Sequence, residues 1–132
     1  MNYLLDTHIL LWVLFSPDKL SVKLKDIFSE PTSEKFVSAI SVWEISLKYS
    51  MGKIKLEKRV PSEIPDAVLS MGFNFLDLDS YTASTFYKLP RFKNKDPFDR
   101  MLAWQAICTN YSLLTKDANF AIYKDHGLKV VW

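Results

Sequence analysis

Residues 2–15, which read NYLLDTHILLWVLF, indicate how the chain begins to fold. The short apolar run 2–5 is typical of a buried strand, and it ends at an acidic residue, Asp6. The apolar segment 7–15 then predicts a helix, which the sequence SPD at 16–18 ends. A strand therefore passes into a helix at a carboxylate, and the same pattern returns further along the chain.

The alternation of strands and helices continues to the C-terminus. Further strands are expected over 35–39, 73–78, 112–115 and 128–132, and further helices over 21–30, 41–52, 61–71, 81–89, 97–110 and 117–123. This order predicts the α/β class, with a mostly parallel sheet covered by helices on both faces. No repeat or linker divides the chain, so residues 1–132 are expected to form a single domain.

The composition is that of an ordinary globular protein. The chain has 132 residues, of which 48% are hydrophobic. Its longest apolar run, Ile9 to Phe15, is much shorter than the roughly 18 residues of a membrane span, and the N-terminus lacks the features of a signal peptide. The single cysteine, Cys108, can form no internal disulfide and is expected to be buried. These features favour a cytoplasmic protein with no membrane segment.

Four acidic residues carry most of the chemical information: Asp6, Glu44, Asp99 and Asp117. Each lies where a predicted strand gives way to a helix or where a helix opens, and such junctions meet at one edge of a parallel sheet. Carboxylates gathered there repel one another unless a cation holds them. Mg²⁺ and Mn²⁺ prefer oxygen ligands, and no Cys/His set with zinc spacing is present. The pattern predicts a divalent-metal site suited to phosphodiester hydrolysis.

Each acid also has a purely structural interpretation. Ser41 and Glu44 have the spacing of a capping box, and the sequence DPFD at 96–99 has an aspartate N-cap followed by proline. Asp117 and Asp6 could accept hydrogen bonds from the first amides of their helices. Serine, threonine or asparagine would cap equally well, yet acids occupy all of these positions. The joint pattern therefore favours a shared functional role.

The net charge of +2 is compatible with two interpretations. The chain has 17 Lys and Arg against 15 Asp and Glu, so the surface is moderately basic once the four clustered acids are set aside. A polyanion could approach such a surface around an acidic, metal-filled cleft. Scattered lysines that keep the protein soluble give the same count.

Four segments resemble PIN-domain proteins of the VapC toxin type. They read LDTHILLW at 5–12, WEISLK at 43–48 followed by GK at 52–53, KDPFDRML at 95–102 followed by QA at 105–106, and LTKDANF at 114–120. The segments occur in the order of the family and span nearly the whole chain. The resemblance implies a three-layer α/β/α sandwich with a mostly parallel central sheet, in a single PIN domain over 1–132.

The resemblance also implies a function. A protein of this type is a metal-dependent endoribonuclease, the toxin of a type II toxin–antitoxin pair that a small DNA-binding antitoxin keeps inactive. Its substrate would be RNA, its cofactor Mg²⁺ or Mn²⁺, and its assembly a homodimer. The catalytic and metal-binding residues implied by motif are Asp6, Glu44, Asp99 and Asp117. Thr115 would orient a carboxylate, and Asp96 would be first a cap and second a possible ligand.

Basic residues near the third segment are candidates for contacts with RNA. Arg91, Lys93 and Lys95 form a loop that could steer phosphates or simply be solvated. Arg100 could contact a phosphate or pair with a neighbouring acid. Asn94 stands where relatives often have histidine, and because asparagine does not titrate near neutral pH, the role of this position in substrate binding is open.

The sequence supports other functions less well than it supports a nuclease. A PIN-like module that binds protein or RNA without catalysis would have no reason to keep four repelling carboxylates. A phosphatase with an aspartyl nucleophile would need a second acid where the chain has His8, which is more simply a structural histidine. The three glycines form no phosphate-binding loop. Large apolar residues, either core or a groove for an antitoxin helix, are Trp12, Phe15, Trp43 and Trp104.

Overall fold

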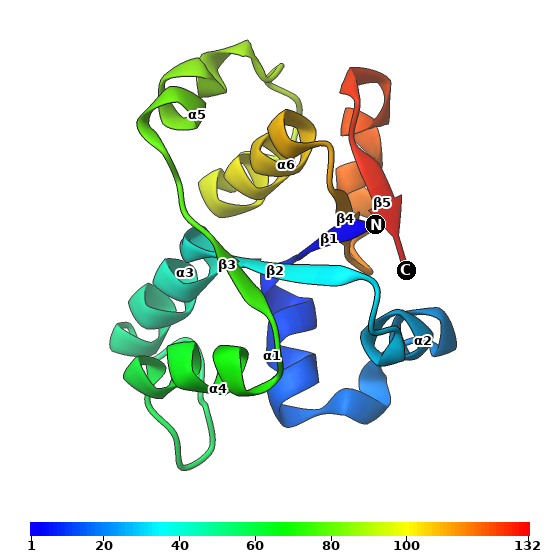
Figure 1. Ribbon diagram of the computed structural model, residues 1–132. Helices are drawn as coiled ribbons and strands as arrows, with labels where there is room; N and C mark the ends of the chain where they lie inside the picture. Colours follow the sequence, from blue (N-terminus) through cyan, green and yellow to red (C-terminus); the bar gives the residue numbers. More distant parts are fainter.

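The computed structural model describes residues 1–132 as one five-stranded sheet with helices on both sides (Figure 1). The strands are β1 (Asn2–Leu5), β2 (Glu34–Ser38), β3 (Asn74–Leu76), β4 (Ser112–Leu114) and β5 (Lys129–Val131). They lie in the order β3-β2-β1-β4-β5, and every neighbouring pair is parallel.

The helices are of two kinds. The α-helices are α1 (Thr7–Phe15), α2 (Val22–Ser29), α3 (Ala39–Ser50), α4 (Ile64–Ser70), α5 (Ser80–Thr85) and α6 (Pro97–Thr109). The 3₁₀ helices are η1 (Pro17–Lys19), η2 (Pro61–Glu63), η3 (Phe86–Lys88) and η4 (Ala118–His126). No helix is both long and apolar enough to cross a membrane.

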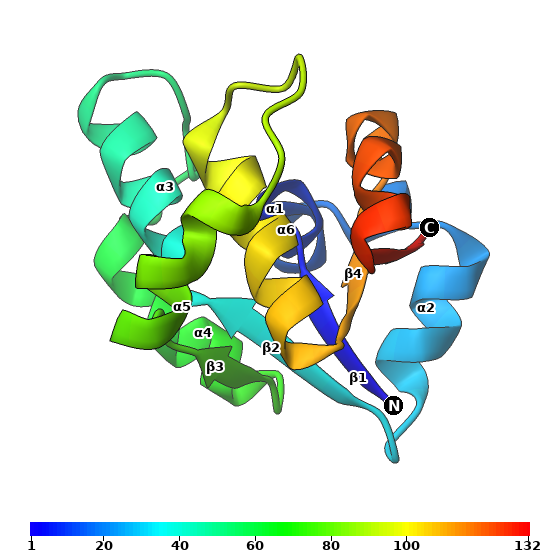
Figure 2. The same ribbon diagram turned by 90° about the horizontal axis from the view of Figure 1, so that it is seen from above.

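Two apolar clusters fill the two faces of the sheet. Successive strand side chains point to opposite faces, so Leu5 of β1 packs in one cluster and Leu4 in the other. The first cluster includes residues of α1, α2 and α4, and the second includes residues of α6 and η4. Figures 1 and 2 show these two groups of helices on opposite sides of the sheet. The predicted three-layer α/β/α sandwich with a parallel sheet is confirmed.

The direction of the chain across the sheet reverses beside β1. From β1 the chain moves through β2 to β3 at one edge, and then returns through α5 and α6 to β4 on the other side of β1. Ligands of open α/β sheets bind beyond the carboxyl ends of the strands at such a point. Asp6 directly follows β1 here, and its backbone N–H donates to the carbonyl of Leu114 at the end of β4.

Helix α3 begins earlier than its sequence predicts. Ser38, the last residue of β2, caps the helix by accepting a hydrogen bond from the Ile40 amide, so the predicted capping box of Ser41 and Glu44 is wrong. Both residues lie inside the helix and are buried. The cap lies at Ser38 because β2 ends there, where its pairing with Leu76 of β3 also ends.

Smaller differences from the predicted elements occur at helix ends and at one side chain. The helices expected over 61–71 and 81–89 each combine a 3₁₀ turn with a short α-helix, and η4 replaces the α-helix expected over 117–123. Cys108 is exposed rather than buried. The buried face of α6 is formed by Leu102, Ala103, Gln105 and Ala106, and Cys108 lies outside it.

Candidate active site

Asp6 is held in place by the start of α1. Its side chain is only 4% exposed, and one carboxylate oxygen accepts hydrogen bonds from the amides of His8 (2.6 Å) and Ile9 (3.1 Å). The Thr115 hydroxyl donates to the other oxygen. Burial raises the pKa of Asp6, although these hydrogen bonds, with Thr115 foremost, act in the opposite direction. The Asp6 carboxylate is therefore fixed in orientation and costly to keep charged without a further positive charge.

Glu44 approaches the same region from α3. It is 3% exposed, and the Thr7 hydroxyl donates to its Oε1 at 2.7 Å. Its Oε2 forms an ion pair with Lys48 one helical turn later. The pKa of Lys48 is raised, first by this hydrogen bond and then by the charges of Glu44, Asp96 and Asp99. Sequence reasoning missed Lys48, although its spacing of four residues from Glu44 is the signal of a helical ion pair.

Asp99 is a second acid of the site whose pKa is raised. It lies in the first turn of α6, which begins after the N-cap Asp96, and no group donates a hydrogen bond to its carboxylate. Its pKa is raised to about 7, first by burial and then by the charges of four other acids. In order of effect, these acids are Asp96, Glu44, Asp6 and Asp117. All the predicted acidic residues thus act on one carboxylate, at one end of the sheet.

Asp117 completes the group from the segment after β4. Its side chain is exposed, and its Oδ1 accepts from the Asn119 amide at 2.9 Å at the start of η4. The Thr115 hydroxyl accepts a hydrogen bond from the Asp117 amide while it donates to Asp6. Thr115 consequently connects the ends of β1 and β4.

The donor set fits a hard divalent cation in its chemistry. All four predicted ligands are carboxylates, and the raised pKa of Asp99 reports a local excess of negative charge that a cation would relieve. As the side chains are arranged, however, no three acidic, histidine or cysteine residues lie close enough together to hold a metal ion. The oxygens of Asp6 and Glu44 are already engaged by protein donors. Cation binding would therefore require side chains to move.

The sequence model of the PIN domain matches residues 3–125. The chain belongs to the PIN domain family. Among solved structures, it is similar to VapBC2 from Rickettsia felis bound to a DNA fragment from its promoter, with a TM-score of 0.70 and 21% identity over 99% of this chain and 98% of that one. DNA-bound VapBC from Salmonella typhimurium gives a TM-score of 0.67 and 18% identity, over 99% of this chain and 97% of that one.

A third structure extends this likeness. FitAcB from Neisseria gonorrhoeae gives a TM-score of 0.65 and 18% identity over 98% of this chain and 96% of that one. At these identities the likeness establishes a shared fold. No curated protein sequence matches the chain.

The predicted basic residues occupy different surroundings in this PIN domain. Arg91, Lys93 and Lys95 are exposed on the loop before α6. Arg100 instead donates to the Leu89 carbonyl at 3.2 Å and lies over the Phe86 ring, 4.7 Å from its centre. These contacts give Arg100 a structural role in holding the segment before the loop, and its contact with RNA stays a prediction.

Proposed function

We propose that this PIN domain is a metal-dependent endoribonuclease and the toxin of a type II toxin–antitoxin pair. The observation that carries the proposal is the half-buried Asp99 carboxylate, which lacks a hydrogen-bond donor and whose pKa the charges of four other carboxylates raise. Such an arrangement is unfavourable in isolation and favourable around a cation.

The residues of the site have distinct roles in this proposal. A bound Mg²⁺ or Mn²⁺ would supply a contact to the scissile phosphate and lower the pKa of the attacking water. Asp6 and Asp99 would be the main ligands, and Glu44 and Asp117 would complete the site, with Asp96 as a second choice. Thr115 would keep the Asp6 carboxylate oriented, because it already donates to it.

The expected partners are inferred from the similar solved structures and from an exposed apolar surface on α3. Three structures that share the fold, VapBC2, VapBC and FitAB, are bound to DNA, which supports a DNA-binding antitoxin as the partner of this chain. Trp43 on α3 is 59% exposed and lines an apolar cavity of about 200 Å³ with Phe86 and Met101. We propose that an antitoxin helix or the second subunit of a homodimer covers this surface.

RNA cleavage by the purified protein tests the nuclease. With Mn²⁺ in excess, we expect Asp99→Asn and Asp6→Asn to lower the cleavage rate by at least about 100-fold, because each removes a charge that the cation needs. Asp26→Asn, an exposed acid on α2, is the matched control and should cleave like the wild type. Full activity of metal-saturated Asp99→Asn would refute the assignment of the site.

One observation favours an alternative, a binding module without catalysis. No three candidate ligands are close enough to hold a metal ion, and the Lys48 ammonium already lies beside Glu44. Calorimetric titration with Mn²⁺ separates the two functions. Heat of binding that disappears in Asp99→Asn supports the nuclease, and no metal-dependent heat in the wild type supports the binding module.

A further inference from the structure

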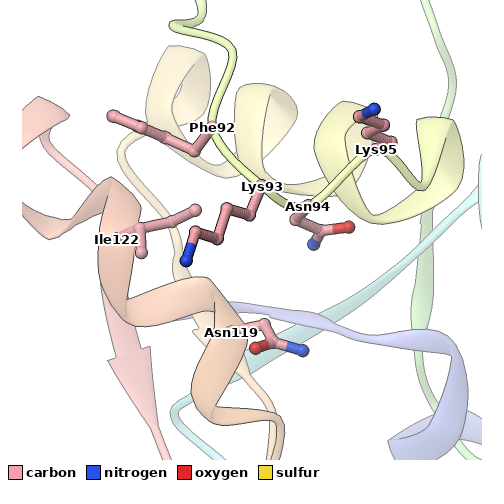
Figure 3. Close-up of a pocket in the computed structure, with 6 residues that line it drawn as sticks. All are labelled: Phe92, Lys93, Asn94, Lys95, Asn119 and Ile122. Carbon is pink, nitrogen blue, oxygen red and sulfur yellow. The ribbon is translucent and has the colours of Figure 1, made fainter.

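A cavity of about 910 Å³ lies beside the acidic site, between the loop before α6 and η4 (Figure 3). Its lining residues are Phe92, Lys93, Asn94, Lys95, Asn119 and Ile122. Both walls are connected to the acids by hydrogen bonds. Asn94 accepts from the Asp96 amide at 3.0 Å, and the Asn119 amide donates to the Asp117 carboxylate. A group in this cavity would therefore lie next to the candidate catalytic residues.

Asn94 lines the cavity and carries a hydrogen-bond donor that no protein group uses. Its Nδ2 is buried and has no partner, and such a group usually costs about 1–3 kcal/mol unless something binds it. The Asn94 side-chain oxygen accepts a hydrogen bond from the Asp96 N–H, which fixes the orientation of the Asn94 amide. The Nδ2 atom is therefore the one without a partner. In Figure 3 Asn94 lies on the loop before α6, and Asn119 lies on η4 at the opposite wall.

The remaining lining groups combine apolar, amide and cationic character. Lys93 extends from the loop across the cavity toward η4, and the side-chain amide of Asn119 faces the cavity from the other wall (Figure 3). Ile122 is 40% exposed, and Phe92 is 39% exposed with its ring against those of Tyr123 and His126. A bare anion would not use the apolar surface, and an apolar peptide would leave the amides and the ammonium unpaired.

We propose that this cavity is a nucleotide subsite for an unpaired residue of the RNA strand. Its base would lie against the apolar surface of Phe92 and Ile122 and receive hydrogen bonds from the amides of Asn94 and Asn119. Its phosphate would pair with Lys93. Single-stranded RNA is recognised through such combinations of apolar contact, base-edge hydrogen bonds and phosphate contacts. The inference rests on the proposed nuclease for its place in catalysis, but nucleotide binding can be measured without cleavage.

Nuclear magnetic resonance of the Asp99→Asn protein tests the subsite directly. The side-chain amide signals of Asn94 and Asn119 are followed while AMP, CMP, GMP, UMP or inorganic phosphate is added. We expect at least one nucleotide to shift both signals, phosphate alone to leave them in place, and Lys93→Gln to weaken the binding by about tenfold. Lys23→Gln on α2 makes the same charge change far along the chain and should bind like its parent.

Two results would overturn the subsite. Equal shifts with phosphate would reduce it to an anion site, and no shift with any nucleotide would leave the cavity without this role. Cleavage assays complete the test: Asn119→Ala should lower kcat/KM by about tenfold, chiefly through KM, in an otherwise active protein. If nucleotides bind but the wild type cuts no RNA, the subsite stands and the proposed nuclease fails.

Discussion

Asp6 and Asp99 differ in the hydrogen bonds that stabilise their charged carboxylates. Asp6 receives hydrogen bonds from two backbone amides and from Thr115, whereas the Asp99 carboxylate receives none. Asp6 is buried and Asp99 is half-buried, and burial raises the pKa of each. The difference is that hydrogen bonds partly offset the cost of a charge on Asp6, whereas no hydrogen bond does so for Asp99.

The first prediction concerns the stability of the metal-free protein as pH changes. The pKa of Asp99 is about 7 in the folded protein against an ordinary value of 3.8, so the folded state binds more protons between these values. Stability should therefore fall as pH rises from about 4 to about 7. Asp99→Asn should remove the part of this fall that Asp99 causes and gain roughly 1–2 kcal/mol at pH 8, after allowance for solvent screening. Urea denaturation in EDTA at pH 5 and pH 8 measures it.

The second prediction concerns a buried hydroxyl. Tyr123 is fully buried in η4, and its hydroxyl has no hydrogen-bond partner. An unsatisfied buried hydroxyl costs about 1–3 kcal/mol, so Tyr123→Phe should raise the free energy of unfolding by about 1 kcal/mol while the ring contacts remain. Thermal denaturation compares the two proteins. A clear loss of stability in Tyr123→Phe would mean that the hydroxyl has a hydrogen-bond partner in solution. Tyr111→Phe, which removes the hydroxyl of a tyrosine that is only half-buried, is the control.

At the scale of elements, a buried serine couples α3 to α6. The Ser38 hydroxyl caps α3 through the Ile40 amide and also donates to the Gln105 side chain of α6 at 2.5 Å. Since Glu44 lies on α3 and Asp99 on α6, this contact connects the two helices that carry half of the acidic quartet.

The third prediction follows from this connection. Ser38→Ala removes the cap and leaves the buried Gln105 oxygen unpaired, so it should lower the free energy of unfolding by about 2–3 kcal/mol. Ser46→Ala, on the exposed side of the same helix, should change stability by less than about 0.5 kcal/mol. Equal effects of the two substitutions, measured by urea denaturation, would contradict the coupling.

Elements fixed by local chemistry could be predicted from the sequence, and those fixed by packing could not. The sequence predicts β1 and the α6 N-cap at Asp96 because apolar runs and capping residues act within a few positions. The start of α3 depends instead on where β2 stops pairing with β3, so Ser41 gave the wrong cap. The exposure of Cys108 depends on which face of α6 meets the sheet.

The candidate site shows the same division. Acids at strand ends predict a shared location, and the charges around Asp99 agree with it. The Lys48 ion pair lies within α3, and its spacing of four residues from Glu44 is visible in the sequence. The cavity beside Asn94 depends instead on how a loop lies relative to η4, which no single segment encodes.

At the scale of the whole molecule, the proposed site joins separate parts of the chain. Asp6 follows β1, Glu44 belongs to α3, Asp99 to α6, and Asp117 precedes η4. The parallel sheet places these segments together, although their carboxylates repel one another. Burial of the two apolar clusters thus offsets the repulsion between these carboxylates in the folded protein.

The fourth prediction is that a divalent cation stabilises this arrangement as a whole. A ligand that binds only the folded state at 100 times its dissociation constant adds about 2.7 kcal/mol, which for a domain of this size is several degrees in Tm. Mn²⁺ should therefore raise the Tm of the wild type. The increase should be larger at pH 8 than at pH 6, because Asp99, with a pKa of about 7, must lose its proton to bind the cation.

Asp99→Asn should abolish most of the increase in Tm, and Asp26→Asn should retain it. A rise in Tm that is the same in all three proteins and at both pH values would show that Mn²⁺ acts elsewhere on the surface.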